Sequence, residues 1–571
     1  MLVARASIRP NAQLRWTLTA NIRSRTFSSR VSRGQSYSSQ DAIDLLNTLQ
    51  TPFKVFQARV AAGVRPDASF MTEMRSCLAR IGHSPRDLDR LNIVHVAGTK
   101  GKGTVCAYVD SILNRWRASH GVPGKLGLLT SPHLISVRER IRINSEPVSE
   151  DLFAKYFFEV WDRLEQNPPQ GSVEGVSNDG SGRKDDWLDH WSGGSYAGKP
   201  IYARYLTLMS WHLFLSEGVD LAVYETGIGG EYDATNVVER PLATAITTLG
   251  IDHVHALGGT IGEIAWHKAG IIKSGSMNYT VRHEAFPEAE DVLKERAAEK
   301  GAELELLEID PRLDTVKINP DKEFQRKNAT LGVALAEAAL SKLDPSFTVK
   351  ESLPQEFVEG LEKVVWRGRC EVKEEDDVRW HIDGAHTLDS LKVAGGWFAD
   401  EVKTKYVPWM IIYGWYGLAN FFPDLVLEHL YSISKAAPRQ PNSYRTFVPQ
   451  PGHQTAKGLT WWSFAQIEHM LSRASSEFVN LTVDAAEVDS LKVQHAFAKK
   501  WLELDPNAGE VKIVARIEEA IQAVRQLAAG KAPSAAGKGN HQPDQVQALV
   551  TGSIHLIGGA LEILEGDAKT L

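Results

Sequence analysis

The stretch that decides the fold is Ile93-Val-His-Val-Ala-Gly-Thr-Lys-Gly-Lys-Gly-Thr-Val105, in which an apolar, β-branched run leads directly into a glycine-rich loop. Apolar spacing typical of a helix follows over residues 105–116. Binding a phosphate group requires closely approaching backbone N–H groups, a point charge and a helix N-terminus. The residues that supply these groups are Gly98, Gly101, Gly103 and Lys102. The stretch therefore predicts a nucleotide phosphate loop between a strand and a helix; an ordinary glycine turn is the alternative.

The spacing of this loop differs from that of the common eight-residue phosphate loop. Val96 stands where that pattern needs a glycine, and Gly103 separates Lys102 from the hydroxyl group of Thr104. Thr104 still offers an oxygen ligand for magnesium. We interpret the loop as a shorter form of the phosphate cradle.

Composition sets the class of protein. The chain has 571 residues, 43% of them hydrophobic, which is enough for two or three domains with separate cores. Even long apolar stretches, such as residues 205–215, fall short of the roughly 20 residues that cross a bilayer, so no transmembrane segment is expected. The three cysteines, Cys77, Cys106 and Cys370, are too widely spaced for a disulfide framework and suit a reducing compartment.

The first 39 residues differ from the rest of the chain. They contain seven arginines and many serines, and no acidic residue precedes Asp41. This composition is typical of a mitochondrial transit peptide, and a basic tail that binds an acidic surface is the alternative. Without these seven arginines the chain has 57 basic and 71 acidic residues, which gives a net charge near −14. A net negative charge of this size argues against a nucleic-acid surface. We expect a location in the mitochondrial matrix; inner-membrane association and a cytosolic form starting at Met71 stay open.

Strands and helices alternate from residue 91 onward, after helical spacing within residues 41–80. The expected strands are 91–97, 125–129, 220–224 and 242–249, and the expected helices are 105–116, 151–164 and 205–216. This alternation predicts βαβ units, and therefore an α/β fold with a mostly parallel sheet. Ligands of such sheets bind beyond the carboxyl ends of the strands.

A domain boundary is expected near residue 355, after a helix at residues 328–343 and around two prolines. It divides the chain into the segment 1–39, a first domain at 40–355 and a smaller α/β domain at 356–571. Within the first domain, residues 167–200 are rich in Gly, Ser and Asp and are expected to be a solvated insertion. Expected strands of the second domain are 379–382, 407–413, 478–483 and 546–551.

Two polar side chains stand at the ends of neighbouring expected strands. Glu225 follows strand 220–224 and precedes a glycine-rich loop, where an α/β ATPase places a magnesium ligand. His253 follows strand 242–249 and suits a second metal ligand or a group that orients phosphate. The alternatives are a carboxylate that caps a loop and a hydrogen-bonded structural histidine.

A basic loop follows strand 125–129. Ser131-Pro-His133 leads into a segment with three arginines, at positions 138, 140 and 142. Next to a phosphate loop, such a segment suits an anionic second substrate, and a solvated charged strand is the alternative. Lys268 lies on a short apolar helix, from which most lysines extend into solvent.

In the second domain, strand 379–382 ends in Asp383-Gly-Ala-His386, with Arg367 and Arg369 shortly upstream. These charged groups suit a surface that closes over a nucleotide from the opposite side. Taken alone, the Asp-Gly pair indicates only a turn.

Together these segments resemble the folylpolyglutamate synthases, relatives of the bacterial Mur ligases, in their eukaryotic, mitochondrially targeted form. The resemblance extends from residue 40 to about residue 565. Its blocks are residues 41–50, 98–104, 131–144, 225–238, 250–273, 383–387 and 550–556. Chance convergence does not explain several blocks in the same order. It could explain a single motif.

The resemblance implies an ATP-dependent ligase that adds L-glutamate to the γ-carboxylate of tetrahydrofolate (poly)glutamates through an acyl-phosphate intermediate. The fold implied is a P-loop, Mur-ligase-like domain that binds ATP and folate, followed by a Rossmann-like α/β domain that closes over nucleotide and glutamate. The implied substrates are ATP, a reduced folate and L-glutamate, with Mg²⁺ as the metal cofactor. We expect a monomer.

Roles for single residues also follow from the resemblance. It implies that the phosphates of ATP are held by Gly98, Thr99, Gly101, Lys102, Gly103 and Thr104, and the rest of the nucleotide by Gln325, Asn328, Arg369 and Asp383. The implied magnesium ligands are Ser131, Glu225 and His253, and the implied catalytic residues are Lys102, Lys268 and His386. Lys268 matches a lysine that is carbamylated in bacterial relatives, and His386 matches a residue near the incoming glutamate.

Some positions depart from the family pattern. Phe324 replaces a histidine, Arg367 replaces a proline before Gly-Arg, and Thr226 replaces an aliphatic residue. Residues 414–421 depart from the family pattern, in which an Asn directly follows the strand and an Arg-Asp pair comes after it, so a substrate or nucleotide contact in the second domain is expected to be lost or rebuilt. Two other functions stay open: a dihydrofolate synthase, and a nucleotide-binding family member without ligase activity.

Overall fold

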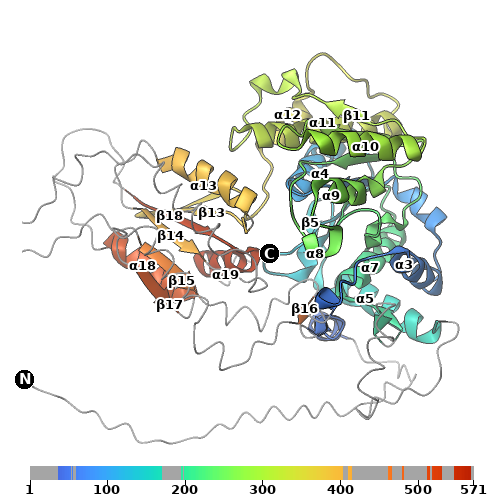
Figure 1. Ribbon diagram of the computed structural model, residues 1–571, viewed down its shortest axis with the longest axis horizontal. Coiled ribbons are helices and arrows are strands. Elements are labelled where there is room, and N and C mark those ends of the chain that lie inside the picture. The colour runs from blue at the N-terminus through green and yellow to red at the C-terminus, as the bar shows by residue number, and fades with distance from the viewer. Residues whose placement is uncertain are drawn as a thin grey trace, which may run out of the picture. The chain divides into compact units, whose positions relative to one another are not determined.

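The computed structural model describes residues 37–52, 55, 59–169, 195–196, 198–386, 388–402, 409–413, 461–465, 479–480, 511–514, 517–529 and 545–566. Met1–Tyr37 and Ser38–Leu571 form separate units, and every element below belongs to the second (Figure 1). The described helices include none that is long and apolar enough to cross a membrane. Residues 1–36 of the predicted transit peptide lie outside the described residues.

The first sheet has eight strands in the order β11-β10-β9-β2-β8-β3-β4-β5. The six strands from β11 to β3 are parallel, whereas β4 and β5 add antiparallel at one edge. The strands are β2 Val94–Ala97, β3 Leu126–Leu129, β4 Ile141–Ile143, β5 Glu146–Pro147, β8 Leu221–Glu225, β9 Ala243–Ile246, β10 Met277–Val281 and β11 Glu305–Leu307. The predicted α/β fold with a mostly parallel sheet is confirmed.

The central strands of this sheet are apolar throughout because both of their faces are covered. Along β8, Leu221 and Val223 belong to one buried cluster, and Ala222 and Tyr224 belong to another. Successive side chains of a strand point to opposite faces, so the two clusters lie on the two sides of the sheet. This burial explains why the sequences of these strands are continuous apolar runs.

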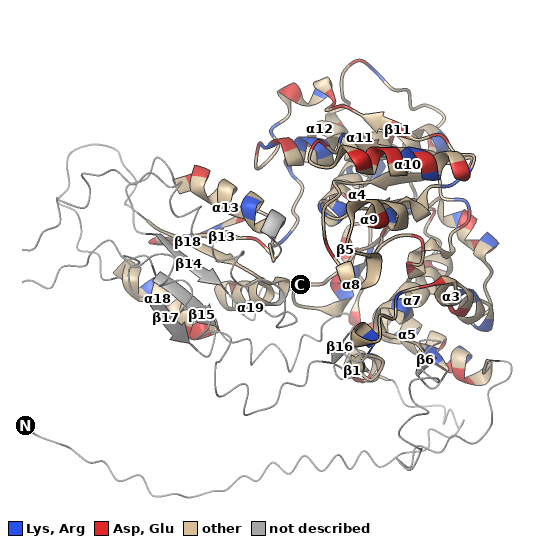
Figure 2. Cartoon of the chain, in the orientation of Figure 1, with Lys and Arg blue, Asp and Glu red and all other residues tan. Residues whose placement is uncertain are grey.

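Helices follow the strands as the sequence predicts. They are α1 Ser39–Asn47, α3 Ala68–Arg80, α4 Lys102–His120, α5 Glu150–Gln166, α7 Tyr202–Glu217, α8 Val254–Leu257, α9 Ile261–Lys268, α10 Pro287–Glu299, α11 Glu323–Leu343 and α12 Gln355–Glu362. The helix predicted at 105–116 begins earlier, at Lys102, because Gly101 in a left-handed conformation already caps it. Along α10, acidic and basic residues are mixed on the outer surface (Figure 2).

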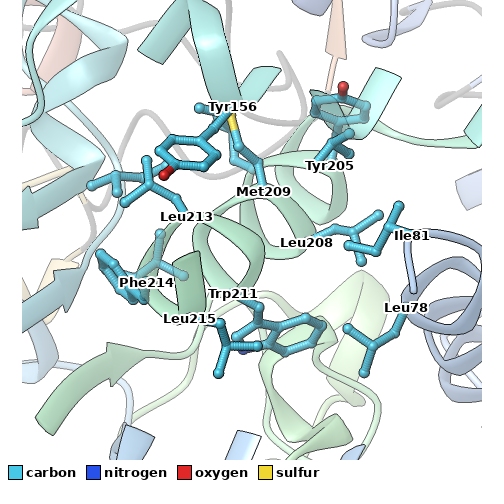
Figure 3. Packing of buried hydrophobic residues seen from close by; sticks show 14 of the residues in the cluster. Leu78, Ile81, Tyr156, Tyr205, Leu208, Met209, Trp211, Leu213, Phe214 and Leu215 are labelled. Carbon is cyan, nitrogen blue, oxygen red and sulfur yellow. The ribbon is translucent and has the colours of Figure 1, made fainter. Parts of the chain in front are cut away.

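Helix α7 lies in the core on one face of the first sheet. It has 12 buried residues among its 16, and Leu208 and Trp211 face Leu78 and Ile81 near the end of α3 (Figure 3). A helix that is apolar on all sides is stable only when other elements enclose it. The covering helices are α1, α3 and α5.

The second sheet has six strands in the order β12-β13-β18-β14-β15-β17. Its strands are β12 Glu371–Glu375, β13 Val378–Ile382, β14 Trp409–Tyr413, β15 Trp461–Ala465, β17 Val511–Val514 and β18 Val546–Thr551. All pairs are parallel except β12 with β13. The helices α18 Ile517–Ala529 and α19 Ile554–Glu565 contribute to its core, and α13 Leu388–Val402 follows β13.

The predicted strands of this region are found with one difference. The strand predicted at 478–483 is present as β16 Val479–Asn480, but it pairs with β1 Thr51–Pro52 and not with the second sheet. Both sheets belong to one compact unit, so the boundary near residue 355 stays a prediction. Residues 170–194 of the predicted insertion, and residues 414–421, lie outside the described residues. The end of the insertion is not solvated, because Lys199 is buried against Glu165.

A core substitution tests the packing around α7. Leu208→Ala removes a side chain that is fully buried and is expected to lower the free energy of unfolding by about 2–5 kcal/mol. Denaturant titration measures this change. The control Val349→Ala, at an exposed position, should change it by less than about 0.5 kcal/mol. Equal effects of the two substitutions would contradict the packing described.

Candidate functional site

The phosphate loop connects β2 to α4 and leaves no space for side chains at two glycines. Gly98 (φ 145°) and Gly101 (φ 93°) have backbone conformations that favour glycine. A Cβ atom on Gly98 would lie 1.8 Å from Thr247 Oγ1, and one on Gly101 would lie 2.2 Å from Asn328 Oδ1. The backbone can therefore approach β9 and α11 closely, as the phosphate-loop prediction requires.

Thr99 supports the loop through backbone contacts with the segment after β9. Its hydroxyl group donates to the carbonyl oxygen of Gly250 and accepts the N–H of Gly250, both at 3.1 Å. The backbone N–H groups of Thr99 and Lys100 donate to the carbonyl oxygen of Thr248. These two amides are thus already hydrogen-bonded, and the amides that remain for a phosphate belong to the start of α4.

Two lysines converge on one carbonyl oxygen of the loop. The Nζ atoms of Lys102 and Lys268 lie 3.1 and 2.7 Å from Gly98 O. Lys268 is buried, and burial together with the positive charge of Lys102 holds its pKa well below the ordinary value. Two ammonium groups this close repel each other, so the arrangement favours a bound anion or a neutral Lys268 amine.

Glu225 ends β8 and lies beside the segment that follows β3. Its Oε2 atom accepts the backbone N–H of Ser131 at 2.9 Å, so these two predicted magnesium ligands are in contact. Glu225 is only 6% exposed. Burial and, next, the Glu225 carboxylate raise the pKa of the Cys106 thiol, which places Glu225 near the first turn of α4.

His253 precedes α8 and is neutral at physiological pH. Its pKa is lowered to about 3, chiefly by burial; Asp252 acts in the opposite direction, and Lys268 and Lys102 lower it further. A neutral imidazole has a lone pair for a metal. These electrostatic contacts place His253 near both lysines of the loop.

Two of the three predicted magnesium ligands offer the oxygen atoms that this ion prefers, and the third offers an imidazole nitrogen. Hydroxyl, carboxylate and imidazole groups come from Ser131, Glu225 and His253. Among the residues described, no three His, Cys, Asp or Glu side chains group closely enough to hold a metal ion alone. Magnesium is usually held by one or two carboxylates together with substrate phosphates and waters.

The loops around Glu225 and His253 are held by residues that the sequence analysis did not select. Asp233 accepts the backbone N–H groups of Gly227 and Ile228, at 2.9 and 3.1 Å, and thereby fixes the loop after β8. His283 accepts the backbone N–H of Leu249 at 3.3 Å. In the sequence both look like ordinary loop residues; only the spacing of Asp233 within the glycine-rich segment gave a signal.

Helix α11 lies against the phosphate loop through Asn328. The Asn328 side chain donates to Gln325 Oε1 at 2.9 Å, and both side chains are buried. Because Asn328 is also the neighbour that leaves Gly101 no room for a Cβ atom, the two predicted nucleotide contacts adjoin the loop.

The predicted residues of the second sheet gather at the end of β13. Asp383 accepts the N–H groups of Cys370 and Ala385, at 2.8 and 2.9 Å, and burial raises its pKa even though Arg369 acts in the opposite direction. His386 Nδ1 lies 2.9 Å from the carbonyl oxygen of Gly384. The Asp383 carboxylate therefore already stabilises the turn that follows β13.

Asp252 connects this group with the phosphate loop. Its carboxylate pairs with Lys100 Nζ at 2.9 Å. Burial would raise the pKa of Asp252, but the nearby His253, Lys100 and His386 outweigh it and hold the pKa far below its ordinary value. His386 therefore contributes to the positive field at Asp252. The sequence pointed to His253 but gave no signal for the neighbouring Asp252.

A cavity of about 210 Å³ adjoins Ser131 and Glu225. Its walls are largely apolar and include Phe70, Leu129 and Tyr232. Four arginines also line it: Arg59, Arg65, Arg140 and Arg204. Only Arg140 belongs to the basic segment that the sequence analysis singled out, and nothing in the sequence linked the other three.

A phosphate loop on a parallel sheet, followed by a second α/β sheet, defines a protein of the Mur-ligase fold. The solved structure of Mycobacterium tuberculosis folylpolyglutamate synthase complexed with ADP superposes with a TM-score of 0.61 and 22% identity, over 92% of this chain and 100% of that one. Escherichia coli FolC in complex with DHPP and ADP gives 0.57 and 20%, over 88% and 98%. At these identities the likeness shows the fold.

The sequence relatives are much closer. Folylpolyglutamate synthase of Neurospora crassa is 51% identical over 543 residues, which cover 94% of each chain. That of Saccharomyces cerevisiae is 37% identical over 540 residues, covering 93% of this chain and 87% of the relative. No protein-family model matches the chain. The chain belongs to the folylpolyglutamate synthase family.

A pair of glycine substitutions tests the phosphate loop. In Gly101→Ala the new Cβ atom meets Asn328, so we expect ATP affinity to fall at least about a hundredfold. The control is Gly121→Ala, also at positive φ but with no atom within 4 Å of the new Cβ, which should bind ATP normally. Isothermal titration calorimetry with an ATP analogue measures both, and equal affinities would contradict the assignment.

Proposed function

We propose that this chain is an ADP-forming ligase that joins L-glutamate to the γ-carboxylate of reduced folates ending in glutamate. The main support for this proposal is the 51% sequence identity to a folylpolyglutamate synthase over nearly the whole of both chains. The site supports it, because Lys102 and Lys268 meet at Gly98 O beside buried Glu225 and an adjoining cavity. In this role the protein retains folates for one-carbon metabolism, and we propose that it acts as a monomer.

The chemistry requires activation of the folate carboxylate. A carboxylate is a poor acyl donor to an amine, so an oxygen of the γ-carboxylate first attacks the γ-phosphorus of ATP, ADP leaves, and the carboxylate becomes an acyl phosphate. The amine of L-glutamate then attacks the acyl carbon, the amide forms, and phosphate leaves. Both steps crowd negative oxygen atoms at the edge of the first sheet.

The chain's own groups are suited to these steps. The first amides of α4 and the Lys102 ammonium group bind the β- and γ-phosphates and offset their charge. Glu225 and His253, with the hydroxyl group of Ser131, would hold magnesium, which when bound neutralises the transferring phosphoryl group. Gln325 and Asn328 bind the nucleotide on the α11 side. From the second sheet, Arg369 and Asp383 contribute to the nucleotide site, and His386 orients the incoming glutamate.

The lowered pKa of Lys268 suits a further role. A neutral amine reacts with carbon dioxide to form a carbamate, whereas an ammonium group does not. We propose that Lys268 is carbamylated in the working enzyme, which would place a negative group between Lys102 and the metal site. That change would also relieve the repulsion between the two lysines.

The cavity beside Ser131 and Glu225 suits the folate. Its apolar walls match the aromatic part of a folate, and its arginines match carboxylates. A γ-carboxylate at the Ser131 side would face the phosphate loop.

The decisive experiment is mass analysis of folates after incubation of the protein with ATP, Mg²⁺, L-glutamate and tetrahydrofolate. We expect products that are longer by one or more glutamyl units, and a loss of roughly 10²–10³-fold in turnover for Lys102→Ala. The control Lys294→Ala, an exposed lysine on α10, should match wild type.

Three outcomes would contradict the proposal. Products formed only from dihydropteroate would indicate a dihydrofolate synthase. ATP binding without any folate product would indicate a nucleotide-binding protein. Unchanged turnover in Lys102→Ala would refute the phosphate-loop assignment.

We also propose that residues 1–39 direct the protein into the mitochondrial matrix, on the basis of their arginines and serines and the lack of acidic residues. A fluorescent protein fused after residue 39 should enter mitochondria. The same fusion with the seven arginines replaced by glutamine should stay in the cytosol. Cytosolic location of the first fusion would refute the proposal.

A further inference from the structure

His95 is a polar side chain within β2, the strand that leads into the phosphate loop. Its exposed fraction is 0%, and its neighbours along the strand, Val94 and Val96, are apolar. Burial, together with the positive charge of Lys273, lowers the pKa of His95 to about 3, so the ring is neutral. Its Nε2 atom lies 2.7 Å from Thr235 Oγ1, and among the described residues no group bonds to Nδ1. Burying an imidazole for one hydrogen bond costs more than burying an apolar side chain, which indicates that this bond has a function.

Thr235 connects His95 with Asp233. The hydroxyl group and the backbone N–H of Thr235 both donate to Asp233 Oδ1, at 2.5 and 3.0 Å. The other carboxylate oxygen, Oδ2, accepts the N–H groups of Gly227 and Ile228. Burial raises the pKa of Asp233, and these four hydrogen bonds, which a carboxylate accepts, act in the opposite direction. Because the hydroxyl hydrogen of Thr235 is directed at the carboxylate, its oxygen accepts from His95, which assigns the Nε2–H tautomer to the ring.

We propose that His95 is a positioning residue of the ligase, which fixes the loop after β8 as one wall of the acceptor cavity. This inference rests on the proposed function, since it takes the cavity to hold the folate. His95 does not line the cavity, but every residue that its hydrogen bond reaches does: Thr235, Asp233, Gly227 and Ile228. Strand β2 pairs with both β8 and β9, so it offers a rigid point from which the loop is held.

The metal side of the site is held separately from this loop. Glu225 lies within β8, where it pairs with Val96, and the N–H of Thr226 donates to the carbonyl oxygen of Val96 at 2.9 Å. Loss of the His95 hydrogen bond should therefore act on the loop beyond Thr226 and leave Glu225 in place. The expected signature is a higher KM for the folate with an unchanged KM for ATP. A general loss of packing would not separate the two substrates in this way.

The test compares two substitutions of His95 that differ in the donor. In His95→Gln an amide N–H can replace the Nε2–H, whereas His95→Leu has no donor. We expect KM for tetrahydrofolate to rise roughly tenfold in His95→Leu and to stay within about threefold of wild type in His95→Gln, with KM for ATP unchanged in both. Thr235→Val should raise KM for tetrahydrofolate at least as much. Adding His95→Leu to it should cause no further rise, because the bond is already absent.

The control is His212→Leu, which removes another buried histidine, bonded to Glu159 at 2.8 Å, that does not line the cavity. It should lower the melting temperature and leave both KM values unchanged. A readout independent of turnover is ¹⁵N NMR of histidine-labelled protein. It should show a neutral Nε2–H imidazole that is absent in His95→Gln and shifted in Thr235→Val.

Four results would overturn the positioning role and leave the proposed function intact. They are an unchanged KM for tetrahydrofolate in His95→Leu, an equal rise of both KM values, effects that multiply in the double variant, and an Nδ1–H tautomer. If His95→Leu does not fold, which thermal melting would show, Thr235→Val and the NMR signal decide the question. If wild type lengthens no folate, the proposed function fails and the positioning role fails with it.

Discussion

The arrangement at the carboxyl edge of the first sheet depends on one constraint, the confinement of positive charge against a backbone with no room for side chains. Lys102 and Lys268 both contact Gly98 O, and Gly98 itself is pressed against Thr247. Such close approach is possible only for glycine. Lys268 is buried and Lys102 is half-buried, so positive charge at this carbonyl oxygen is partly shielded from water and acts strongly on an anion that enters.

The surrounding elements preserve this arrangement because their side chains form hydrogen bonds with the polar backbone groups of the loops. Asp233 accepts backbone N–H groups after Glu225, Thr99 binds both polar groups of Gly250, and His283 accepts the N–H of Leu249. Each loop is thereby fixed by the neighbouring strand end, and the chemical groups need little reorganisation when a ligand binds. The ion pair of Lys100 with Asp252 extends the same principle towards His386.

Much of the fold could be predicted because its signals are local. The apolar run before Gly98 and the glycine-capped start of α4 lie within a few residues of each other, so they indicate strand, loop and helix directly. The pairing of β16 with β1 could not be predicted, because it joins segments more than 400 residues apart. Asp233 and His283 were not selected for a different reason. Their role lies in hydrogen bonds with backbone N–H groups, which the sequence does not show, and Arg204 meets Glu73 only through the packing of α3 against α7.

One departure from the family pattern shows how this chain replaces a backbone restraint by charge. Arg367 stands where the resemblance to the family leads us to expect a proline, whose ring would restrict the backbone just before Gly368. Here Arg367 pairs instead with Glu371 at 2.9 Å and with Glu565, at the end of α19, at 2.7 Å. Glu565 also receives Lys373 at 3.3 Å, so the segment before β12 is tied to the last helix by a network of charges and not by an isolated pair. Such a network is screened by salt, whereas a proline ring is not, so the restraint on this segment depends on ionic strength in a way that a proline would not allow.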